Sequence, residues 1–182
     1  MAKPRDSFMS NLQKVLINVK TLEKYIKPEP TDVYIEYDGS AMITETDLDG
    51  IITYTNRKFA ELSGYSRKEL IGLPHSIVRH PDVPRGVFKA MWKIITQKKV
   101  WRGYIKNITK DGSYYWALVY VQPKLDSEGN HIGYVSNRKD AYPRAIKEVE
   151  QKFQELNSDE FIDDPYFMEN ELFLGEDLGK FS

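Results

Sequence analysis

The sequence predicts an α+β domain, an antiparallel sheet with helices packed on one of its faces. Two strand-like segments joined by a tight turn lie near residues 41–55, and three more lie over residues 100–138. Helix-like segments fill the interval between the two groups. Sequential hairpins with helices gathered between them place those helices on one side of the sheet. A length of 182 residues suits one such domain with terminal extensions.

The strands are expected where β-branched and aromatic residues run between turn residues. The first pair is Ala41–Thr46 and Ile51–Thr55, joined by an Asp-Leu-Asp-Gly turn. The remaining three, Val100–Thr109, Tyr114–Leu125 and His131–Arg138, are separated by Lys-Asp-Gly-Ser and Asp-Ser-Glu-Gly-Asn turns. They therefore predict a three-stranded meander.

Short helices are expected between the two groups of strands. Asn56 is a suitable N-cap for a helix that Gly64 ends. Ser66 and Glu69 have the spacing of a capping box. A longer amphipathic helix begins near Pro84, since proline is tolerated in a first helical turn.

Both termini are predicted to lie outside the central α+β domain, which we expect to cover residues 37–141. Over residues 1–30, Asp6 to Ile26 has a helical apolar spacing that predicts an amphipathic helix for capping or dimerisation. Residues 142–157 predict a further helix, because Ile146, Val149 and Phe153 follow at the intervals of three and four that are typical of a short coiled coil. Residues 158–182 form an acidic tail.

Composition excludes several classes of function. The 26 basic and 27 acidic residues leave no electrostatic footprint for nucleic acid. No cysteine is present, so the chain has no disulfide and no thiolate nucleophile or metal ligand. Without a long apolar run we expect no membrane insertion and a cytoplasmic location. Phosphate-binding glycine motifs and a Ser-His-Asp constellation are not evident either, so we do not expect an enzyme.

The middle of the chain resembles a known family. Residues 46–56, with Phe59 and the Ser-Gly-Tyr at residues 63–65, resemble the opening of a PAS domain. The segment Pro-His-Ser-Ile-Val-Arg-His-Pro-Asp-Val-Pro at residues 74–84 narrows the resemblance, together with the Trp-Arg-Gly at residues 101–103. These motifs are similar to the PAS modules of bacterial aerotaxis receptors and of stand-alone energy-taxis sensors.

That resemblance implies a five-stranded antiparallel sheet and FAD held in the cleft between sheet and helices. It implies a redox sensor that signals to a membrane-bound chemoreceptor or another effector, as a homodimer. By position in the motifs, the residues expected to contact the cofactor are Trp101, Arg79, His80, Asp82, Asn56, Asn107 and His75.

Each of these residues also has an ordinary structural interpretation. Trp101 could be a core residue on a strand rather than a flat wall for an aromatic ring. Arg79 and Asp82 could form a local salt bridge, with Asp82 capping the helix near Pro84. Asn56 could serve only as a helix cap.

Two alternative functions stay open at this point. His75 or His80 could be an axial ligand of haem, which would make the domain a gas sensor. The domain could instead bind no ligand and act as a dimerisation or scaffold module, with its own side chains filling the cleft.

Overall fold

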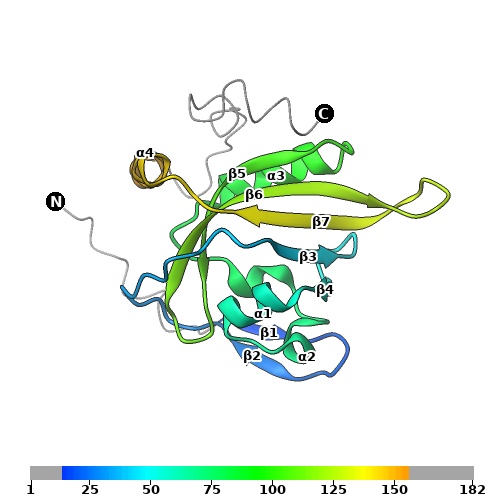
Figure 1. Ribbon diagram of the computed structural model, residues 1–182. Coiled ribbons are helices and arrows are strands. Elements are labelled where there is room, and N and C mark those ends of the chain that lie inside the picture. Colours follow the sequence, from blue (N-terminus) through cyan, green and yellow to red (C-terminus); the bar gives the residue numbers. More distant parts are fainter. Residues whose placement is uncertain (1–13, 156–182) are drawn as a thin grey trace.

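The structure is a computed structural model that describes residues 14–155. Its centre is a five-stranded antiparallel sheet with the strand order β4-β3-β7-β6-β5 (Figure 1). The predicted α+β fold is confirmed. The sheet strands are β3 (Met42–Thr46), β4 (Ile52–Thr55), β5 (Trp101–Ile108), β6 (Tyr114–Leu125) and β7 (His131–Lys139). Because β3 pairs with β7, the first hairpin joins the edge of the later meander in one sheet.

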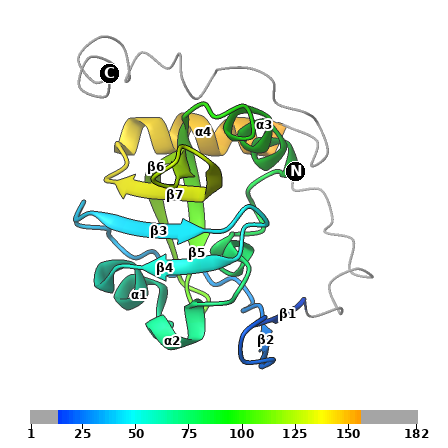
Figure 2. The same cartoon turned by 90° about the vertical axis from the view of Figure 1, so that its right-hand side faces the viewer.

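Four helical elements separate the two groups of strands. They are α1 (Arg57–Ser63), α2 (Arg67–Leu70), the 3-10 helix η1 (His75–Val78) and α3 (Arg85–Ile95). α4 (Pro143–Glu155) follows the last strand. Figure 2 turns the same ribbon by a quarter turn and shows α1 and α2 beside β4.

The local signals behind α1 and α2 are present as expected. The Asn56 side chain accepts a hydrogen bond from the Phe59 backbone N–H at 3.1 Å, and Gly64 ends α1 in a left-handed conformation. Ser66 and Glu69 form both hydrogen bonds of a capping box. α3 begins next to Pro84 as expected, with Pro84 at the N-cap position and no side chain capping the helix.

The N-terminal segment is a β-hairpin, so the predicted helix is wrong for residues 15–26. β1 (Val15–Ile17) pairs with β2 (Lys24–Ile26), and Leu22 adopts a φ of 63° in the turn between them. Both views place this hairpin beside α2 (Figures 1 and 2). The Asn18 amide donates to the carbonyl oxygens of Glu69 and Ile71, a contact that helical periodicity does not reveal. The expected helical residues before position 14 lie outside the described residues.

The hairpin fits closely at Gly72, which makes a test of its docking possible. A Cβ added at Gly72 would lie 2.3 Å from the Asn18 side-chain oxygen, and the φ of 98° disfavours any other residue. We expect Gly72→Ala to lower the free energy of unfolding by about 1–3 kcal/mol. The variant should also speed hydrogen exchange at Val19, whose N–H donates to the Gly72 carbonyl oxygen.

Gly129→Ala is the matched control for this substitution. Gly129 has a φ of 84°, but a Cβ there meets nothing within 4 Å. It therefore carries the backbone cost without the contact with the hairpin. Equal losses of stability in the two variants, with unchanged exchange at Val19, would contradict the role of Gly72 in docking.

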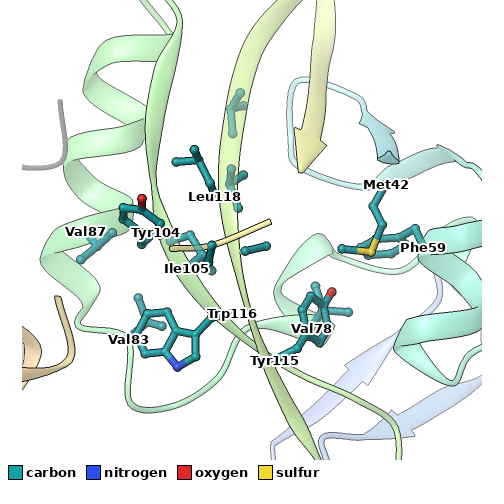
Figure 3. Packing of buried hydrophobic residues seen from close by; sticks show 14 of the residues in the cluster. Met42, Phe59, Val78, Val83, Val87, Tyr104, Ile105, Tyr115, Trp116 and Leu118 are labelled. Carbon is teal, nitrogen blue, oxygen red and sulfur yellow. The ribbon is translucent and has the colours of Figure 1, made fainter. Parts of the chain in front are cut away.

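The C-terminal helix is confirmed as α4, and it packs on the outer face of the sheet. Trp116 on β6 stacks on Phe153 of α4, with ring centroids 6.0 Å apart. Strand alternation sends Tyr115 to the other face, where it is fully buried. Figure 3 shows part of the core, with Tyr115 and Trp116 on neighbouring positions of one strand. The acidic tail expected over 158–182 lies outside the described residues.

Candidate functional site

The inner face of the sheet, η1 and α3 enclose a cavity of about 220 Å³. Each water molecule in the liquid occupies about 30 Å³, so the space is several times that size. Most of the lining side chains are apolar, and a few polar ones converge among them, as in many small-molecule sites. The polar residues of the lining include Thr44, His75, Arg79, Asn107, Ser136 and Arg138.

Trp101 lies in the wall of this cavity at the start of β5. Its indole lies against Gly103, because a Cβ at Gly103 would come within 2.6 Å of two indole ring atoms. Gly103 therefore makes room for the tryptophan.

We expect Gly103→Ala to push the Trp101 ring into the cavity and to weaken ligand binding there, by roughly tenfold or more. The clash involves only the ring of Trp101. Adding Trp101→Phe to Gly103→Ala should therefore restore much of the space. Titration of the purified variants with flavin measures both effects, and a double variant no better than Gly103→Ala would contradict this explanation.

Deep in the cavity, a buried arginine is held without a carboxylate. Arg138 on β7 is 2% exposed, and its guanidinium lies 2.9 Å from His75 Nε2 and 3.3 Å from Thr44 Oγ1. It also lies over the Phe59 ring at 4.7 Å. Among the described residues, no carboxylate forms an ion pair with it. Burial lowers the pKa of Arg138, although the guanidinium stays charged.

The arginine fixes the state of His75. A guanidinium only donates hydrogen bonds, so His75 Nε2 accepts, and the neutral ring carries its proton on Nδ1. Burial, with the nearby charge of Arg138, lowers the pKa of His75 to about 3. Thr44 Oγ1 accepts from Arg138 and donates to the same Nε2. His75 is therefore a neutral acceptor for the arginine.

Three buried donors in the lining have no hydrogen-bond partner within residues 14–155: Asn107 Nδ2, Ser136 Oγ and Arg138 Nε. Leaving a buried donor unsatisfied costs about 1–3 kcal/mol. Asn107 lies on β5, and Ser136 and Arg138 lie at alternate positions of β7. Their common feature is that they can donate, so the cavity complements a ligand with several acceptor atoms.

Arg79 reaches the cavity from the segment after η1. Its guanidinium stacks 3.9 Å from the Phe88 ring centroid and donates to the Val83 carbonyl oxygen at 3.3 Å. Burial lowers the pKa of Arg79, with a contribution from the charge of Arg85. Arg79 also forms an isolated antiparallel bridge with Asn107, which brings two of the expected residues together.

The structure thus gathers four of the seven expected residues around the cavity, namely Trp101, Arg79, Asn107 and His75. Asn56 is outside the lining, and its side chain is fully used. Its oxygen accepts from the Ile43 and Phe59 backbone N–H groups, and its nitrogen donates to the Ala41 carbonyl oxygen. Asn56 therefore ties α1 to β3, and its contact with a cofactor stays a prediction.

His80 and Asp82 are also outside the lining. His80 Nδ1 accepts from the Asp82 backbone N–H at 3.1 Å. The Asp82 carboxylate pairs with Lys106 Nζ at 2.8 Å on the outer face of β5. Neither residue lines the cavity, because the extended chain that points Arg79 inward turns its neighbour His80 outward. Direct contact of either residue with a cofactor stays a prediction. Asp82 does not cap α3 either.

Arg138 and Thr44 were missed from the sequence, although a signal existed. Side chains alternate along a strand, so residues 134, 136 and 138 face the same way. Extending that alternation from Tyr134 and Ser136 on β7 to Arg138 would have placed a cation in the cleft. Thr44 follows by the same rule from the buried Met42 on β3.

The arrangement of histidines bears on metal and haem binding. Within residues 14–155, no group of three His, Asp or Glu residues could hold a metal ion. His75 is the histidine of the cavity lining, and its Nε2 already accepts from Arg138. An axial ligand of haem needs that lone pair, so the geometry favours a ligand other than haem in this cavity.

None of the helices within residues 14–155 has the length and apolar character of a membrane span.

Comparison with known proteins gives a consistent pattern. Residues 40–141 match the family model described as the PAS fold. The chain is 38% identical over 121 residues to the aerotaxis receptor of Escherichia coli strain K12. The match covers 66% of this chain and 24% of the receptor, so the chain spans about a quarter of that relative.

Solved structures resemble the same region. The blue-light photoreceptor Aureochrome1 LOV, in its dark structure, is 29% identical with a TM-score of 0.51, covering 64% of this chain and 86% of that one. A light-oxygen-voltage domain studied with a flavin analogue is 21% identical with a TM-score of 0.53, covering 65% and 90%. The second likeness shows the fold alone.

Proposed function

We propose that this chain, which belongs to the PAS family, is a redox sensor that holds a flavin in the cavity between sheet and helices. One observation carries the proposal: three buried donors without a partner among the described residues, on Asn107, Ser136 and Arg138, line the same cavity as the flat Trp101 ring. A flavin ring is planar and carries several carbonyl and ring-nitrogen acceptors along its edge. The donor set and the aromatic wall fit that shape and that chemistry.

When bound, the flavin would supply reversible electron uptake. The residues of the chain would orient and tune it. Arg138 would place a positive charge beside the ring, and His75 would hold the arginine through Nε2 without adding charge of its own. Trp101 and Ile105 would shield the ring from water on the side of β5.

The relatives support a sensory role. One is named an aerotaxis receptor, and another a blue-light photoreceptor. We therefore propose that a change in flavin redox state reaches α4 through the sheet, since Trp116 stacks on Phe153. A membrane-bound chemoreceptor or another effector would read this change from a cytoplasmic homodimer. The protein would turn over no substrate.

An absorption spectrum of the protein purified without added cofactor tests the proposal. We expect the two visible bands of an oxidised flavin, which bleach with dithionite and return in air. Because flavin can be lost during purification, a colourless preparation should then be titrated with FAD, FMN and riboflavin. A Soret band would instead show haem. No colour and no uptake of any flavin would contradict the proposal and favour a ligand-free interaction module.

A further inference from the structure

An ion pair outside the cavity lies directly behind two residues that line it. On the outer face of β5, Lys106 Nζ pairs with the Asp82 carboxylate at 2.8 Å and lies 4.4 Å from the Tyr114 ring centroid. The Lys106 side chain is only 9% exposed. A buried ammonium is costly unless it is paired, so Lys106 depends on these neighbours for its place.

The backbone connects this ion pair to the cavity. Arg79 and Asn107 form an isolated antiparallel bridge, and the His80 N–H donates to the Lys106 carbonyl oxygen at 3.3 Å. Alternation turns Asn107 inward and Lys106 outward. One short junction thus presents two side chains to the cavity and carries an ion pair on its other side.

The junction joins an irregular segment to the sheet. The segment of residues 79–83 belongs to neither a helix nor a strand, and its bridge to β5 is isolated from the main sheet. The His80 ring, which is buried, lies 6.0 Å from the Tyr114 ring centroid on the same outer side. An outward movement of this segment would withdraw Arg79 from the cavity and loosen Asn107.

We propose that Lys106 and Asp82 are a positioning pair for the cavity. They hold the Arg79–Asn107 bridge from the outside, so that both inner side chains keep the geometry that a ligand needs. This inference rests on the proposed flavin site for its affinity readout. It gives Asp82 a role in binding although the carboxylate does not line the cavity.

The experiment compares Lys106→Met and Asp82→Asn with Lys110→Met in the full chain. Lys110 is the matched control, because its Nζ also pairs with a carboxylate at 2.8 Å, that of Glu69, and lies near the Tyr65 ring. Flavin titration should show roughly tenfold weaker binding for the first two variants and no change for the control. Lys106→Arg, which keeps the charge, should recover most of the affinity.

A second readout needs no flavin. Amide hydrogen exchange of the ligand-free protein should speed up at His80 and around the bridge in Lys106→Met and Asp82→Asn, and should stay at the wild-type rate in Lys110→Met. If amide exchange at His80 stays at the wild-type rate in Lys106→Met and Asp82→Asn, the positioning role is overturned, whether or not flavin binds. Faster exchange in a protein that takes up no flavin would support the positioning role and contradict only the proposed function. Faster exchange in all three variants, the Lys110→Met control included, would mean that loss of any such ion pair loosens the fold. That result would also overturn the positioning role.

Discussion

Replacing Arg138 with methionine is expected to weaken flavin binding by tenfold or more while leaving the ligand-free protein as stable or more stable. Arg138 is buried, and in the part of the chain that the structure describes it pairs with no carboxylate and its Nε has no hydrogen-bond partner. Methionine fills similar space and removes the cost of burying that charge. The bound flavin would lose a hydrogen-bond donor and a positive charge. A substitution that raises the free energy of unfolding but lowers the affinity for flavin would show that Arg138 serves binding rather than stability.

The same substitution should lower the reduction potential of whatever flavin remains bound. A cation beside the ring stabilises the more negative reduced form, so its removal makes reduction harder. Chemical unfolding measures the stability, titration measures the affinity, and spectroelectrochemistry measures the potential. A large loss of stability with unchanged affinity and potential would mean that Arg138 is structural.

Acidification is expected to destabilise the ligand-free protein through His75. Its pKa is about 3 in the folded protein and about 6.5 when unfolded. Between those values the unfolded chain binds a proton that the folded chain does not, so the free energy of unfolding falls as pH falls. The slope contributed by this group is about 1.4 kcal/mol per pH unit at most. The contribution is fully present above pH 6.5 and is lost progressively as the pH falls toward 3.

His75→Gln provides the control for that expectation. A glutamine carbonyl oxygen can accept from Arg138, but it does not titrate. The variant should therefore show a shallower loss of stability between pH 7 and pH 5, measured by urea unfolding at several pH values. Parallel curves for wild type and variant would show that other groups cause the acid sensitivity.

Local patterns were sufficient to predict most of the fold. The turn before Ile51 forms because the Asp47 carboxylate accepts from the backbone N–H groups of Asp49 and Ile51, and both short-helix caps depend on residues three apart. The first hairpin was not predictable in this way. Val15, Leu16 and Val19 also fit a helical stripe, whereas the hairpin depends on contacts of Asn18 and Val19 with the distant chain at residues 69–72.

The sequence predicts a site residue correctly where the residue's place in a regular element also fixes the direction of its side chain. Trp101 and Asn107 lie on a regular strand, where alternation fixes that direction. Asp82 lies in an irregular segment, where sequence spacing gives no such rule. Its pairing with Lys106 depends on a bridge between segments about 25 residues apart along the chain, which spacing alone does not predict.

The isolated bridge at Arg79 has a consequence for how a cofactor is loaded. The wall formed by η1 and the following residues is joined to β5 through a short junction rather than a full ladder of hydrogen bonds. Such a segment can open while the sheet stays folded, because local opening costs less than global unfolding. A bulky ligand would then enter and leave at a rate set by the opening of this segment. The time for which the protein keeps its ligand would depend on that opening rate as much as on affinity.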